Sequence, residues 1–66
     1  MNKDILEGKW KELKGSVQAK WGDITDDQLD VINGNREKLI GTLQENRGIL
    51  KEEAEKLVDE WEETHH

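Results

Sequence analysis

The sequence contains no cysteine and no proline, and no run of apolar residues in it is longer than two. Without cysteine the chain has no disulfide, no thiolate nucleophile and no cysteine-ligated zinc or iron–sulfur site. Because long apolar runs are lacking, we expect neither a transmembrane helix nor the apolar core of a signal peptide. Small secreted domains usually carry disulfides, so the sequence predicts a cytoplasmic protein.

The 66 residues are enough for a single domain, residues 1–66, around one small core. Hydrophobic residues make up 32% of the chain and charged residues 39%, a balance close to that of disordered proteins. The spacing of the apolar residues must therefore decide whether the chain folds. Ten basic and sixteen acidic residues give a net charge of −6, which repels phosphate backbones and anionic membranes.

Apolar residues recur every three or four positions, which is typical of amphipathic helices. This spacing predicts four helices, at about Asp4–Trp21, Asp26–Asn33, Asn35–Arg47 and Leu50–Glu63. The residues expected to face the core are Leu6, Trp10, Leu13, Val17, Trp21, Leu29, Ile32, Leu39, Ile40, Leu43, Ala54, Leu57, Val58 and Trp61.

The ends of the helices carry recognisable signals. Thr25 and Gln28 have the spacing of a capping box, in which each side chain bonds the backbone N–H of the other residue. Gly22, Gly34 and Gly48 follow the first three helices, where glycine commonly ends a helix. The last helix lacks a capping side chain and has acidic residues at its negative end, so we expect its final turn to fray.

Four helices joined by connections of a few residues are expected to pack closely on their neighbours in sequence. We therefore expect an all-α fold of four short helices, arranged as two helical hairpins around one small core. We also expect the chain to be a monomer. His65 and His66 are interpreted as either the remnant of a purification tag or a native tail.

The sequence also resembles a known family. The segments Gly8-Lys9-Trp10-Lys11-Glu12-Leu13-Lys14-Gly15, Trp21-Gly22-Asp23-Ile24-Thr25-Asp26-Asp27 and Ile32-Asn33-Gly34 are similar to the signature of the CsbD-like family of bacterial general-stress proteins. The resemblance extends to Glu53-Ala54-Glu55 and covers nearly the whole chain. It implies two roughly orthogonal helical hairpins and an association with general and osmotic stress. It implies no biochemical activity, and no functional residues are carried over from it.

The chain departs from the family pattern at two places. Leu13 stands where an aromatic residue is typical, and Asn46-Arg47 precede Gly48 where a tyrosine is common. Both changes bear on packing, and we expect Ile49 and Leu50 to fill the missing aromatic volume.

Residues with catalytic or metal-binding chemistry are present, but their spacing is unfavourable. A calcium loop that starts at Asp23 would need glycine at its sixth position and glutamate at its twelfth, where this chain has Gln28 and Gly34. Ser16 has no histidine within helical reach. The adjacent acids of a helix point about 100° apart, so the pairs Asp26-Asp27, Glu52-Glu53 and Glu62-Glu63 are interpreted as solvated. We predict no catalytic, cofactor-binding or metal-binding residue, and no enzyme.

The first helix offers a candidate partner surface at Gly8, Lys11 and Gly15. Glycine costs about 1 kcal/mol relative to alanine inside a helix, so two glycines on the face opposite the apolar stripe need a reason. Local bending or close approach of another segment of the domain is one interpretation, and a docking groove for a partner helix is the other. The surrounding lysines could also attract nucleic acid, which the net charge disfavours.

Two functions fit these observations. The leading hypothesis is a stress-response protein of unknown activity that serves as a hydrophilic protectant. The alternative is a protein-binding module that recognises one partner through its first helix, and nucleic-acid binding is a more distant one.

Overall fold

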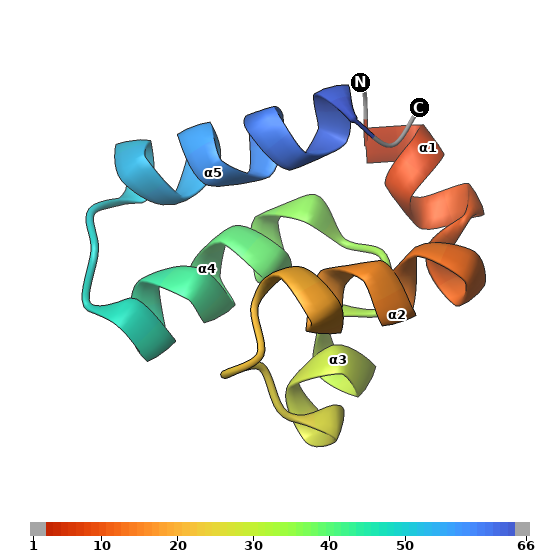
Figure 1. Cartoon of the computed structure of the whole chain (residues 1–66), viewed down its shortest axis with the longest axis horizontal. Helices are drawn as coiled ribbons and strands as arrows, with labels where there is room; N and C mark the ends of the chain where they lie inside the picture. Colours follow the sequence, from red (N-terminus) through yellow and green to blue (C-terminus); the bar gives the residue numbers. More distant parts are fainter. Residues whose placement is uncertain (1–2, 65–66) are drawn as a thin grey trace.

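The structure is a computed structural model that describes residues 3–64. His65 and His66, and the question of their origin, lie outside the described residues. The described chain is all-α and contains no strand (Figure 1). Its five helices are α1 (Lys3–Gly8), α2 (Trp10–Lys20), α3 (Asp26–Ile32), α4 (Arg36–Arg47) and α5 (Lys51–Glu63).

The expected first helix is interrupted at Lys9, so the prediction of one continuous helix from Asp4 to Trp21 is wrong. Lys9 has φ −114° and ψ 16°, and its carbonyl oxygen accepts hydrogen bonds from the N–H groups of Glu12 and Leu13, both at 2.9 Å. Lys9 thus begins α2 rather than continuing α1. The neighbouring Gly8 is a weak helix former, which makes a bend at this point inexpensive.

A segment that is distant in the sequence lies against the junction of α1 and α2. A Cβ atom on Gly34 would lie 2.9 Å from Cα of Glu7 and 3.2 Å from Cβ of Trp10. The backbone after α3 therefore lies in direct contact with the chain at the junction of α1 and α2. We infer that the bend at Lys9 lets both helices pack around this backbone.

The other helix ends follow the sequence closely. The Thr25–Gln28 capping box is present at the start of α3, and Asn35 caps α4 by accepting a hydrogen bond from the N–H of Lys38. Gly48 takes the left-handed conformation, with φ 63°, at the end of α4. At the end of α3, Asn33 takes this conformation before Gly34 does, with φ 40°.

Helix α4 lies at the centre of the arrangement and contacts α1, α3 and α5. The connection from α4 to α5 is only residues 48–50, and α5 returns along α4 in the opposite direction (Figure 1). These two helices form a hairpin. The expected grouping of all the helices into two roughly orthogonal hairpins is not confirmed.

One apolar cluster forms the core and draws side chains from every helix. Its buried members are Leu6, Trp10, Leu13, Val17, Trp21, Ile24, Leu29, Ile32, Leu39, Ile40, Leu43, Ala54, Val58 and Trp61. The rings of Trp21 and Trp61 lie 5.9 Å apart at 50°, which joins the end of α2 to α5. Leu57 and Ile49 pack against the cluster and are partly buried. Leu50, expected to fill missing aromatic volume, is instead 69% exposed.

Candidate functional site

The candidate partner surface at Gly8, Lys11 and Gly15 lies on two helices rather than one. Gly8 is the last residue of α1, whereas Lys11 and Gly15 lie on α2. Lys11 and Gly15 are four residues apart and share one side of α2. All three residues are exposed. The break at Lys9 therefore separates Gly8 from the face that the other two residues share.

The space above both glycines is open. A Cβ atom built on Gly8 or Gly15 would meet no atom within 4 Å apart from its immediate surroundings in the chain. Close approach of another segment of the domain is thus the wrong explanation for either glycine. The bend at Lys9 gives a local reason for Gly8. Nothing in the structure explains Gly15.

Four lysines lie near these glycines in the sequence, Lys9, Lys11, Lys14 and Lys20, with Glu12 among them, and we call the four lysines the basic surface. All four side chains are exposed. Each ion pair of the described residues involves Arg36 or Arg47, so none uses these lysines. The basic surface is therefore available to an acidic group from outside the molecule.

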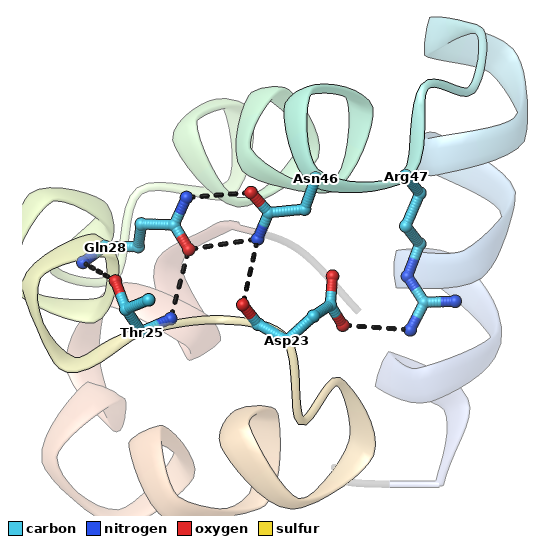
Figure 2. Close-up of polar contacts among 5 residues, drawn as sticks. All are labelled: Asp23, Thr25, Gln28, Asn46 and Arg47. Atoms are coloured by element: carbon cyan, nitrogen blue, oxygen red, sulfur yellow. Dashed lines mark hydrogen bonds and ion pairs between the residues drawn. The ribbon is translucent and has the colours of Figure 1, made fainter.

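A second polar region lies where the connection between α2 and α3 meets the end of α4 (Figure 2). The N–H of Gln28 donates to the Thr25 hydroxyl at 3.1 Å, and the N–H of Thr25 donates to Oε1 of Gln28 at 3.0 Å. The capping box predicted from the sequence is therefore confirmed. It fixes the Gln28 side chain in place at the start of α3.

Asn46 extends this capping box into a contact between helices. Gln28 Nε2 donates to Asn46 Oδ1, and Asn46 Nδ2 donates to Gln28 Oε1, both at 2.9 Å (Figure 2). Asn46 Nδ2 also reaches the carbonyl oxygen of Asp23 at 3.3 Å, and Arg47 forms an ion pair with the Asp23 carboxylate at 3.2 Å. We call these five residues the amide clamp: Asp23, Thr25, Gln28, Asn46 and Arg47. Its side chains bond one another, so it serves to hold α3 against α4.

A third polar group is buried between α4 and α5. Glu62 is 1% exposed, and its Oε1 accepts a hydrogen bond from Nε of Arg36 at 3.1 Å. Arg36 also forms an ion pair with Asp59. Burial alone would lower the pKa of Arg36, but hydrogen bonds and charge from Glu62 and Asp59 outweigh this and raise it above the ordinary value. The interpretation of Glu62 as a solvated residue is therefore wrong.

Sequence reasoning missed both polar contacts between helices. The position of Glu62 offered a signal, because it lies four residues after Val58 and next to Trp61, within the inward stripe of α5. The expectation of a fraying last turn gave Glu62 the opposite role. For the pair Gln28 and Asn46 no signal existed, since the two residues are 18 positions apart and follow no shared motif.

The described residues form neither a metal-binding cluster nor a membrane span. Between residues 3 and 64, no three histidine, aspartate or glutamate side chains are grouped so that they could hold a metal ion. Within the same range, every helix is too short or too polar to cross a bilayer.

The surface of the described residues includes three open hollows. The first, of about 410 Å³, lies between α2 and the end of α5 and includes Ser16, Ala19 and Trp61. The second, of about 450 Å³, is bounded by Arg47, Ile49, Glu53, Lys56, Leu57 and Glu60, and we call it the α5 hollow. The third, of about 320 Å³, lies at the start of α4 and includes Glu7, Gly34 and Arg36.

Comparison with known proteins gives consistent matches. The model of the CsbD-like family matches residues 4–56. The UPF0337 protein YjbJ of Escherichia coli O6:H1 is 49% identical over 98% of this chain and 94% of its own length. The UPF0337 protein ECA0631 of Pectobacterium atrosepticum is 51% identical over the same shares. The UPF0337 protein pc0632 of Protochlamydia amoebophila is 49% identical over 98% of both chains. No solved structure gives a significant match.

Proposed function

This chain belongs to the CsbD-like family, and from that premise we propose that it is a non-enzymatic stress-response protein that acts as a hydrophilic protectant. In this role it keeps neighbouring proteins apart and hydrated during general or osmotic stress. The cysteine-free sequence is consistent with action in the cytoplasm.

The distribution of charge carries this proposal. Charged residues make up 39% of the chain, and among the side chains whose burial is described Glu62 is the one buried charge. The core meanwhile takes up most of the large apolar residues. Such a molecule presents water with a dense mixture of both charge signs, which keeps proteins soluble and separate.

Drying of a reporter enzyme tests the protectant role. The enzyme is dried and rehydrated with increasing amounts of this protein, and its recovered activity is measured. We expect protection to rise steadily with mass ratio, without a plateau at equimolar protein, and to exceed that of an equal mass of an unrelated folded protein with the same net charge. Equal protection by the two proteins would refute the proposal.

The alternative is a protein-binding module that uses the basic surface and the neighbouring Gly8, Lys11 and Gly15. Its support is the set of exposed lysines that form no ion pair with the described residues, together with the open space above both glycines. Chemical cross-linking in stressed cells distinguishes the two functions. Stoichiometric capture of one protein, lost in a Lys11→Glu and Lys14→Glu variant, supports the module, whereas diffuse capture that is unchanged in the variant supports the protectant.

Nucleic-acid binding would use the same lysines, and the net charge of −6 disfavours it. Titration of the protein with duplex DNA in low salt gives a direct measurement, and this function predicts affinity that falls steeply as salt is added.

A further inference from the structure

Leu50 breaks two local rules at once. It is 69% exposed, the largest exposed fraction among the big apolar side chains whose burial is described. It also occupies the N-cap position of α5, where it provides no hydrogen-bond acceptor. Serine, threonine, aspartate or asparagine at this position would stabilise the helix. Positions where a sequence departs from local rules without a structural benefit are often functional.

The residue before Leu50 borders a hollow on the surface. Ile49 and Leu57 line the α5 hollow of about 450 Å³ and are themselves only partly buried. The exposed Leu50 therefore directly follows Ile49, which lines the α5 hollow. A knob and a hole that lie side by side on one surface are complementary to the same surface of a second copy turned by a two-fold rotation.

The charges around the α5 hollow are also self-complementary. Its rim carries two cationic side chains, Lys56 and Arg47, of which Arg47 also pairs with Asp23 in the amide clamp, and two anionic ones, Glu53 and Glu60. A partner with charge of a single sign would meet repulsion from half of this rim. A second copy brings two charges of each sign, which can face their opposites. The rim therefore favours another copy of the chain over a strongly acidic or strongly basic partner.

We propose that two copies of this chain associate through this surface, with Leu50 of each copy in the α5 hollow of the other, and that ionic strength controls the association. The proposal is independent of the protectant role. The monomer expected from the sequence is then the form present in dilute, low-salt solution.

Salt affects the association through the net charge of each copy. Each copy carries −6, so two copies repel one another at low ionic strength. The Debye length falls from about 30 Å at 0.01 M salt to about 8 Å at 0.15 M. The smallest dimension of the molecule is 17 Å, so the repulsion between whole molecules is strongly screened at the higher concentration. Burial of Leu50 is not weakened by this screening. Salt also screens the attraction between facing rim charges, but these are few beside the net charge of −6 on each copy. Added salt is therefore expected to strengthen association on balance, and loss of cell water raises ionic strength in the same direction.

The size of the surface sets the expected strength. A stable interface buries about 800 Å² on each partner, which is close to a fifth of the 4375 Å² surface of this molecule. The α5 hollow and Leu50 cover only part of that area. We therefore expect a weak dimer, with a dissociation constant of about 10 μM to 1 mM in high salt.

Sedimentation equilibrium between about 0.01 M and 1 M potassium chloride tests the proposal. The variant Leu50→Asp removes the apolar side chain and adds a capping carboxylate, so the folded monomer should become more stable while association is lost. The matched control is Val31→Asp, which changes the charge equally and removes the other large exposed apolar side chain, 63% exposed on α3. Thermal unfolding of each variant confirms that it is folded.

We expect the wild-type protein and the Val31→Asp variant to dimerise as salt rises. Because each dimer contains two copies of Leu50, the Leu50→Asp variant should bind itself about 100-fold more weakly. A wild-type protein that is monomeric at every salt concentration overturns the proposal, even if Leu50 binds another protein or a vesicle. Association that weakens with salt also overturns it. So does an equal loss of association in both variants, which would indicate unspecific apolar contact.

Discussion

At Gly34 two constraints act on one backbone position. Its φ of 81° lies in the region that favours glycine, and a Cβ atom there would overlap the backbone of Glu7 at 2.9 Å. Gly15 is subject to neither constraint, because the space around it is open and its φ is not positive. Two glycines of one chain therefore have opposite roles. One is required by the fold, and the other weakens α2.

The pair of variants Gly34→Ala and Gly15→Ala should change stability in opposite directions. We expect Gly34→Ala to lower the free energy of unfolding by about 2–4 kcal/mol, from backbone strain and steric overlap. Gly15→Ala should raise it by about 0.5–1 kcal/mol, because alanine is the better helix former. Urea unfolding followed by tryptophan fluorescence measures both. A stable Gly34→Ala variant would mean that the chain does not pack against Glu7 as described.

Glu62 combines burial with a charge, and its removal should be costly. We expect Glu62→Gln to lower the free energy of unfolding by about 1–3 kcal/mol, because Arg36 keeps an acceptor but loses the buried charge. The exposed neighbour provides the control, since Glu63→Gln makes the same change of charge and should stay within about 0.5 kcal/mol of wild type. Equal effects in the two variants would contradict the burial of Glu62.

The Arg36 cluster also has a defined pH dependence. Because the pKa of Arg36 is raised in the folded protein, its contribution to stability is fully present below the unfolded pKa. It is lost only as pH rises through the folded value, deep in the alkaline range. Wild type and the Glu62→Gln variant differ in free energy of unfolding, and the part of this difference that arises from Arg36 should therefore be constant across neutral pH.

At the scale of helices, the amide clamp joins the start of α3 to the end of α4. The change Asn46→Ala removes both bonds to Gln28 and the bond to the Asp23 carbonyl. We expect a loss of about 1–2 kcal/mol in the free energy of unfolding. The capping box itself should survive, so the amide of Gln28 should stay protected from hydrogen exchange. The exposed neighbour change Glu45→Ala serves as the control, and a comparable loss there would argue against a specific clamp.

Local signals determined most of the helices, and contacts between distant segments determined the rest. The capping box at Thr25 and the end of α4 at Gly48 depend on neighbouring residues, and both were predictable. The break at Lys9, by our inference, accommodates the approach of Gly34, which is 25 positions away in the chain. No periodicity within residues 4–21 could reveal it.

The candidate partner surface was likewise predictable only where it depends on local sequence. Exposure of Gly15 followed from its position opposite the apolar stripe, and the structure agrees. The separation of Gly8 from Lys11 and Gly15 could not be predicted, because it results from the break between α1 and α2 at Lys9. The prediction for Leu50 was also wrong, because its hydrophobicity favoured burial whereas the structure leaves it exposed at the N-cap of α5.

For the whole molecule, we expect repulsion among like charges to be the main force outside the core. The surface carries a net charge of −6 on a body of 28 × 23 × 17 Å, so the acidic side chains of different helices repel one another in the folded state. A core of this size contributes only about 3–5 kcal/mol of net stability. A modest electrostatic cost is therefore a large fraction of the total.

Salt should therefore stabilise the folded monomer. We expect the midpoint of thermal unfolding to rise by about 4–8 °C between about 0.01 M and 0.5 M sodium chloride, which corresponds to roughly 1 kcal/mol for a domain of this size. The measurement belongs in the Leu50→Asp background at low protein concentration, so that association does not contribute. A double change, Asp27→Lys and Glu45→Lys, reduces the net charge by four units at exposed positions and should remove most of the salt effect. An unfolding midpoint that falls with salt would show that attractive ion pairs, rather than net repulsion, dominate the surface.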